Sequence, residues 1–172
     1  LCCEAFGVWV ERRQGELYGY TLAMVPLAVG LVYADPSEMV LARVVGVMVV
    51  LIVTRQRRFC EFFYEVSVHA TQTMAAIIVF RLVLGEADPV GVRGAFALLA
   101  GLFASYATAA AALATAVTLV GRKWPGGRAM VVLVRSGAAA AVLNAAIGIG
   151  LATTLWEHPH VALLLGAVGA AC

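Results

Sequence analysis

The sequence predicts an all-α protein, a polytopic bundle of about six transmembrane helices, and three observations lead to this fold class. First, 63% of the 172 residues are hydrophobic and only 13% are charged, whereas charged residues make up about a quarter of a soluble domain. Second, long apolar runs alternate with short polar loops. Third, the charge of these loops alternates in sign along the chain, as expected when Lys and Arg are retained on the cytoplasmic side of a membrane.

The apolar runs define the expected helices. A helix needs about 20 apolar residues to cross the hydrocarbon core, so residues 1–10 are long enough only for the end of a span. Residues 17–34 make a full span, in which Pro26 predicts a kink or a local bend. Residues 39–54 are slightly short and include Arg43. The other expected segments are full spans at 62–84, 94–120 and 129–155 and an incomplete span at 161–172.

The orientation follows from the basic loops, which we expect to be cytoplasmic at 11–16, 54–60 and 121–128. Eight of the twelve Lys and Arg residues lie there: Arg12, Arg13, Arg55, Arg57, Arg58, Arg122, Lys123 and Arg128. The opposite loops carry Asp35, Glu38, Glu86, Asp88 and Glu157, with Arg93 as their one basic residue. The positive-inside rule therefore predicts a multi-pass membrane protein, with the last run directed inward.

The chain starts at Leu1 and stops at Cys172 inside an apolar run. We therefore expect residues 1–172 to be one transmembrane domain, a fragment of a longer chain. Because the last run is directed inward, a C-terminal output domain would lie in the cytoplasm.

Small residues dominate the last two full spans, for example at 109–112 and 137–141 and at Gly148 and Gly150. Small side chains let helix backbones approach closely in a membrane. This pattern fits tight packing within the bundle or a dimer interface, and both alternatives stay open.

A polar stripe on the span 62–84 is the best candidate site. Glu61, Glu65, His69 and Gln72 are spaced by four, four and three residues, so they share about a quarter of the helix circumference. A charge at the centre of a bilayer costs at least about 2.5 kcal/mol, so the stripe should face the protein interior. It is either satisfied structurally by neighbouring groups or used as a ligand or proton site.

Depth suggests partners for these polar groups. Arg135 lies as far from the inner side as Glu65, and Asn144 lies level with His69 and Gln72. A second polar cluster is expected near the outer face, where Arg43 and Arg81 lie within reach of acidic residues. These acidic residues are Glu38, Glu86 and Asp88. Trp156 is expected to anchor the outer end of its helix, as interfacial Trp residues do.

Several function classes receive no support from the residues. The net charge of +2, with its basic residues spread over loops, does not indicate nucleic-acid binding. Neither the four cysteines nor the pair His158 and His160 has the spacing of a metal site, and no metal or other cofactor is expected. No phosphate-binding loop or hydrolase motif is present, so we assign no catalytic residue.

Several segments together resemble a known family. They are PLAVGLVYADP (26–36), MVLARVVG (39–46), TRQRR (54–58), VFRLVLG (79–85) and VLNAAIGIGLATTLWEHP (142–159). In order and spacing they resemble the N-terminal multi-span module of actinobacterial membrane signalling proteins, over most of residues 8–170. In that family the module precedes cytoplasmic GGDEF and EAL domains, which make and degrade cyclic di-GMP. The chain departs from the pattern at Glu61 and Glu65, where the family usually has Lys and Asn, and at Gln72, where it usually has Glu.

The resemblance implies a sensory or anchoring domain in a bacterial inner membrane that regulates a cytoplasmic signalling domain. The parent protein would be a diguanylate cyclase or phosphodiesterase, and a homodimer is expected because paired GGDEF domains must meet to condense two GTP molecules. Membrane lipid and a small-molecule ligand are the other expected partners. The alternatives are a small-molecule transporter subunit, similar to the substrate-binding component of a vitamin transporter, and a structural membrane subunit of a larger complex.

Overall fold

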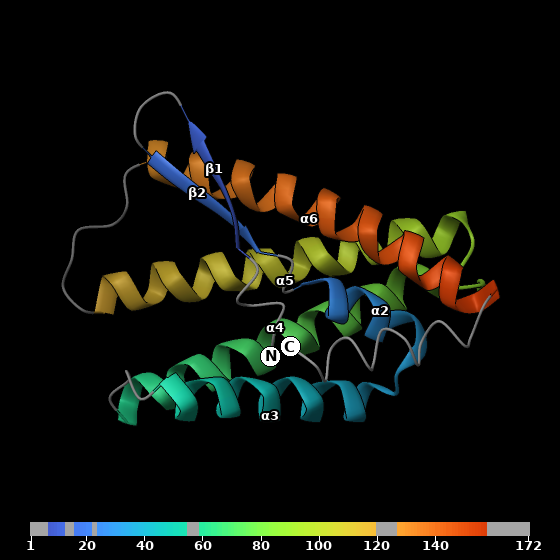
Figure 1. Ribbon diagram of the computed structural model, residues 1–172, viewed down its shortest axis with the longest axis horizontal. Helices are drawn as coiled ribbons and strands as arrows, with labels where there is room; N and C mark the ends of the chain where they lie inside the picture. Colours follow the sequence, from blue (N-terminus) through green and yellow to red (C-terminus); the bar gives the residue numbers. More distant parts are fainter. Residues whose placement is uncertain (1–6, 13–15, 22–23, 55–58, 120–126, 158–172) are drawn as a thin grey trace.

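The computed structural model describes residues 7–12, 16–21, 24–54, 59–119 and 127–157. These residues form a hairpin followed by five helices (Figure 1). The elements are β1 (Gly7–Arg12), β2 (Glu16–Thr21), α2 (Val25–Tyr33), α3 (Pro36–Thr54), α4 (Phe59–Leu84), α5 (Val92–Leu119) and α6 (Gly127–Glu157).

The four long helices run antiparallel, each in the opposite direction to the one before (Figure 1). All four are long and apolar enough to cross a membrane, and their most apolar windows have mean hydropathies between 1.5 and 2.0. The helix ends at Thr54, Phe59, Leu119 and Gly127 lie at one end of the bundle, which we call the basic end because the loops 54–60 and 121–128 join them. The opposite end, with Asp35, is the acidic end. The expectation of a helical membrane bundle is thus confirmed in its coarse form.

The N-terminal part of the chain differs from the expectation of one full span over residues 17–34. The residues Glu16–Thr21 form a strand instead, and β1 and β2 pair antiparallel from Gly7 opposite Thr21 to Arg12 opposite Glu16. The aromatic and β-branched residues of these segments favour strands. Residues 7–12 therefore do not continue the helix expected at 1–10.

Helix α2 is much shorter than the expected span. It has nine residues, with Pro26 in its first turn, which makes it about 14 Å long against a hydrocarbon core of about 30 Å. Proline suits the first turn because its missing N–H is not needed there, so Pro26 begins the helix and does not kink it. The described residues hold four helices of spanning length, fewer than the six expected spans, and the run 161–172 lies outside the described residues.

At the acidic end, residues next to the helix termini explain where α3 begins and where α4 ends. Asp35 precedes α3, and its Oδ1 accepts hydrogen bonds from the backbone N–H (3.0 Å) and the hydroxyl (2.7 Å) of Ser37. This is the arrangement of an acidic N-cap with Pro36 at the first helical position. Helix α4 is followed by Gly85, whose φ of 59° is in the left-handed region that favours glycine. The side chain of Arg93 then donates to the carbonyl oxygen of Val83 at 3.0 Å.

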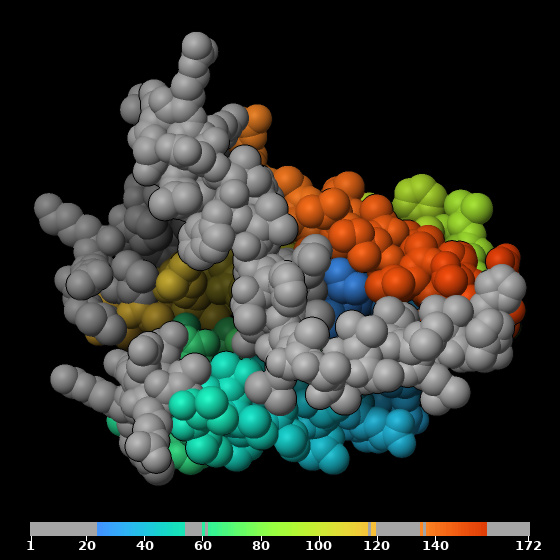
Figure 2. Space-filling model, in the orientation of Figure 1, coloured from blue at the N-terminus to red at the C-terminus, as the bar shows by residue number. Residues whose placement is uncertain are grey.

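The apolar core fills the half of the bundle nearer the acidic end, where α2 lies among the longer helices. Small residues make this packing possible. A methyl group at Gly101 of α5 would come within 2.9 Å of the carbonyl oxygen of Ala76 on α4, and one at Gly148 of α6 would overlap Ala28 of α2. Helix α3 lies along one side of the molecule, at the lower edge of Figure 2. Part of the small-residue pattern thus serves close packing within the bundle.

Candidate functional site: a polar layer in the middle of the bundle

Polar side chains gather one helical turn from the contact of Ala76 with Gly101. Because α4 and α5 run antiparallel, one turn toward the basic end brings Gln72 and Ser105 to the same level. Both side chains are buried. We call the surrounding group the polar layer, and its members are Arg43, His69, Gln72, Ser105, Tyr106 and Asn144.

Arg43 and His69 join α3 to α4 within this layer. Nη2 of Arg43 lies 3.4 Å from Nδ1 of His69. On the other side of the imidazole, Nε2 of His69 lies 4.0 Å from Oε2 of Glu65, one turn earlier on α4. The three side chains therefore form a row in the order carboxylate, imidazole and guanidinium. Ionisable side chains at membrane depth are costly and are usually kept for a function. A row of them between two helices of spanning length is therefore a candidate functional site.

The sulfur of Met24 lies between α3 and α5. Nη2 of Arg43 is 3.8 Å from it, and the hydroxyl of Ser105 is 3.9 Å from it. A thioether is a weak hydrogen-bond acceptor, so Met24 provides a soft polar contact at the start of α2. The side chain itself is buried.

Tyr106 and Asn144 connect α5 to α6. The amide of Asn144 donates to the hydroxyl oxygen of Tyr106 at 3.4 Å and to its own helix at the carbonyl of Ala140 at 2.8 Å. Arg43 of α3 meets α5 at the same level, because its Nη2 and the hydroxyl of Ser105 both lie against the sulfur of Met24. The layer thus reaches from α3 to α6.

Gln72 is the most deeply buried member of the predicted stripe, with 5% of its surface exposed. Its Oε1 atom is buried and accepts no hydrogen bond within the described part of the chain. A buried amide oxygen of this kind costs free energy unless a donor reaches it. This position is therefore a point where a hydrogen-bonding group could be accommodated.

The structure distributes the other sequence-predicted residues differently. Arg43, expected beside Arg81 near the outer face, lies against His69, while Arg81 is exposed on the acidic half of α4. Asn144 is buried in the layer but bonds to α5, because α4 packs chiefly against α5 and α3 and not against α6. Arg135 is exposed on α6 and Glu65 lies beside His69. The side chain of Glu61 lies outside the described part of the structure.

At the acidic end, the charge of Arg81 influences the carboxyl group of Asp35. The two hydrogen bonds from Ser37 hold the pKa of the Asp35 carboxyl below its ordinary value, and the positive charge of Arg81 lowers it further. The sequence predicted Glu38, Glu86 and Asp88 as the acidic residues within reach of Arg81. Asp35, the N-cap of α3, is a further carboxylate near Arg81, one that was not among these predicted partners.

Two tyrosine contacts were not foreseen. The hydroxyl of Tyr33 donates to the carbonyl oxygen of Ala152 at 2.6 Å, and its ring lies 6.2 Å from that of Trp156. These aromatic rings lie at the acidic end of α2 and α6, as an interfacial pair would. Nearer the basic end, the hydroxyl of Tyr64 on α4 donates to the carbonyl oxygen of Ala112 on α5 at 2.7 Å. Only the occurrence of tyrosine near helix ends could have suggested them.

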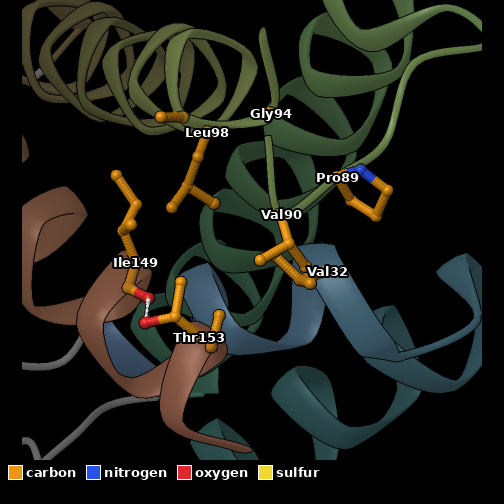
Figure 3. Close-up of a pocket in the computed structure, with 9 residues that line it drawn as sticks. Val32, Pro89, Val90, Gly94, Leu98, Ile149 and Thr153 are labelled. Carbon is orange, nitrogen blue, oxygen red and sulfur yellow. Dashed lines mark hydrogen bonds between the residues drawn. The ribbon is translucent and has the colours of Figure 1, made fainter. Parts of the chain in front are cut away.

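A small apolar pocket opens at the acidic end, between α2, α5, α6 and the loop that follows α4 (Figure 3). Val90 and Val32 lie on one side of it, and Leu98 and Ile149 on the other. Its one hydroxyl, that of Thr153, donates to the carbonyl oxygen of Ile149 at 3.0 Å. The pocket has room for little more than one water molecule, so it is a local gap in the packing and not a ligand cavity.

In the described ranges, no three His, Cys, Asp or Glu side chains lie together in a way that could hold a metal ion. No protein-family model, curated protein or solved structure matches this chain.

Proposed function

We propose that the chain is a membrane sensory domain in which the polar layer is the responsive element. One observation supports this most strongly. Polar side chains from α3, α4, α5 and α6 meet in the middle of four helices that are long and apolar enough to span a membrane. Polar groups at this depth are expensive and are usually functional.

The layer suits a sensor because two of its contacts between helices are long and can be exchanged. The hydrogen bond of Asn144 to Tyr106 and the contact of Arg43 with His69 are both 3.4 Å long, at or beyond the long end of the usual range. A ligand or proton that favours another arrangement of these groups would shift the helices toward it. The polar layer would thereby convert binding into helix movement.

The output would lie on the side of the basic end. The resemblance to modules that precede GGDEF and EAL domains supports a cytoplasmic output domain that makes or degrades cyclic di-GMP. Two protomers would be required for GTP condensation, and the proposal therefore includes a homodimer in a bacterial inner membrane. The chemistry would be carried out by that output domain.

The test measures cyclic di-GMP synthesis and degradation by the full-length protein in lipid nanodiscs. Asn144→Ala removes a buried member of the layer, and Val142→Ala is its control, because Val142 is exposed on the same helix. We expect Asn144→Ala to change the rate and Val142→Ala to leave it at the wild-type value. Equal rates and equal oligomeric states in all three proteins would contradict a sensory role and leave an anchor.

A further inference from the structure

Helix α3 is held to the bundle by a limited surface. Only 11% of its apolar window is buried inside the protein, compared with 28% for α4 and α5 and 33% for α6. It packs mainly against α4. Polar contacts that tie α3 to its neighbours therefore have a large influence on its position, and Arg43 provides them through His69 and Met24.

The contact with Arg43 suits the neutral form of the His69 imidazole. A guanidinium carries only donors, so Nδ1 of His69 must be the acceptor of the 3.4 Å contact. Since Nδ1 is unprotonated, the imidazole is neutral and carries its proton on Nε2, which faces Oε2 of Glu65. This assignment follows from the hydrogen-bond network.

We propose that His69 is a proton-binding site that controls the attachment of α3 to α4. This inference rests on the proposed function, because it names the proton as the signal that the polar layer detects. When Nδ1 takes up a proton from water, it can no longer accept from Arg43, and two positive charges then face each other at 3.4 Å. The protonated state therefore favours a displaced α3.

The groups that face His69 make this site responsive. Glu65 of its own helix lies on the Nε2 side, and its negative charge favours the imidazolium. Arg43 of α3 lies on the Nδ1 side and disfavours it. From α5, Tyr106 is the titratable residue at this level, and α2 contributes the uncharged Met24. Among the described contacts, charges of both signs thus lie beside an imidazole, the side chain that most often changes its charge near neutral pH.

Protons would reach the site from the basic end. Counting from Phe59, Glu65 lies about 9 Å and His69 about 15 Å along α4, whereas Leu84 at the other end is about 22 Å from His69. The two side chains are 29% and 22% exposed. Because α3 also ends at the basic end, at Thr54, its displacement would move the chain on the side where the output domain is proposed.

The test is a distance measurement by electron paramagnetic resonance on the full chain in lipid nanodiscs. One spin label is attached to the native Cys60, which is exposed on α4, and the other to Ile52→Cys, an exposed position on α3. The remaining cysteines, Cys2, Cys3 and Cys172, are replaced by Ser. We expect the distance distribution to shift between pH 8 and pH 5.

His69→Gln keeps an acceptor for Arg43 but cannot take up a proton, so the shift should be lost. Arg43→Met removes the contact altogether and should give a distribution that does not depend on pH. Ser67→Ala, an exposed polar position on α4, is the control and should retain the shift.

No shift in the wild-type protein, or the same shift in both His69→Gln and Arg43→Met, would overturn the proton site. Either result would leave the sensory proposal standing, because the cyclic di-GMP assay with Asn144→Ala tests that separately. Conversely, a pH-dependent shift with no effect on cyclic di-GMP turnover would retain the proton site and reject the sensory role.

Discussion

The side-chain amide of Asn144 donates a hydrogen bond to the hydroxyl oxygen of Tyr106 and so joins α6 to α5 in the middle of the bundle. Asn144 is fully buried. Because buried polar groups in a membrane need partners, this pair predicts a measurable energetic coupling between the two helices.

Tyr106→Phe should lower the free energy of unfolding by about 0.6 kcal/mol, the average for such hydrogen bonds between membrane helices. The effect should be smaller when Asn144 is already replaced by Ala, because the bond is then absent in both proteins. A double-mutant cycle of unfolding in bicelles measures this coupling. Additive effects of the two substitutions would show that the pair does not stabilise the bundle.

The close contact of α6 with α2 gives a second prediction. At Gly148 a methyl group would overlap Ala28, whereas at Gly150 nothing lies within 4 Å of the added carbon. Gly148→Ala should therefore destabilise the protein by about 1–3 kcal/mol, as overpacking does. Gly150→Ala should be neutral or stabilise it by up to about 1 kcal/mol through helix propensity.

The two alanine variants are matched, since both replace a glycine in the same helix. Thermal stability in detergent, followed by size-exclusion chromatography after heating, compares them directly. Equal stabilities of the two variants would be inconsistent with the close packing of α2 on α6.

The N-cap of α3 gives a prediction about pH. The hydrogen bonds from Ser37, aided by Arg81, keep the pKa of Asp35 below its ordinary value. A carboxyl with a lowered pKa in the folded state stabilises that state above its unfolded-state pKa and stops doing so as the pH falls through its folded-state pKa. Ser37→Ala should raise the pKa of Asp35 and weaken the start of α3 at neutral pH but not in acid.

Carbon-13 NMR of the Asp35 carboxyl, titrated in the wild-type and Ser37→Ala proteins, measures the change. Ser67→Ala serves as a control because Ser67 is on α4, away from this cap. An unchanged titration in Ser37→Ala would mean that the cap is not responsible for the lowered pKa.

The long helices could be predicted from the sequence because hydropathy and loop charge act locally. The expected spans 62–84 and 94–120 correspond closely to α4 and α5, and both patterns depend only on neighbouring residues. The run 17–34 was misjudged for the same reason. Its mean hydropathy suits a span, but Pro26 starts a helix there, and the preceding residues pair with β1, a partner that no local pattern identifies.

The sequence identified polar residues of the candidate site but not which of their side chains contact one another. The spacing of His69 and Gln72 predicts one shared face of a helix, and the structure has both residues on α4. Depth placed Arg135 level with Glu65 and Arg43 near the outer face, but it could not reveal their neighbours because the order of the helices in the bundle was unknown. The position of α3 beside α4 brings Arg43 to His69, and that position depends on packing over the whole bundle.

The sensory role and the proton site both require that the four helices cross a membrane with the basic end inside. Labelling by a membrane-impermeant maleimide in intact cells tests this, with Cys2, Cys3 and Cys172 replaced by Ser. One protein retains Cys60, which is exposed at the basic end, and another carries Cys60→Ser together with Glu86→Cys at the exposed acidic end. We predict that the cysteine of Glu86→Cys is labelled in intact cells and that Cys60 is labelled only after the membrane is permeabilised. Labelling of Cys60 in intact cells as rapidly as the cysteine of Glu86→Cys would contradict this orientation of the helices.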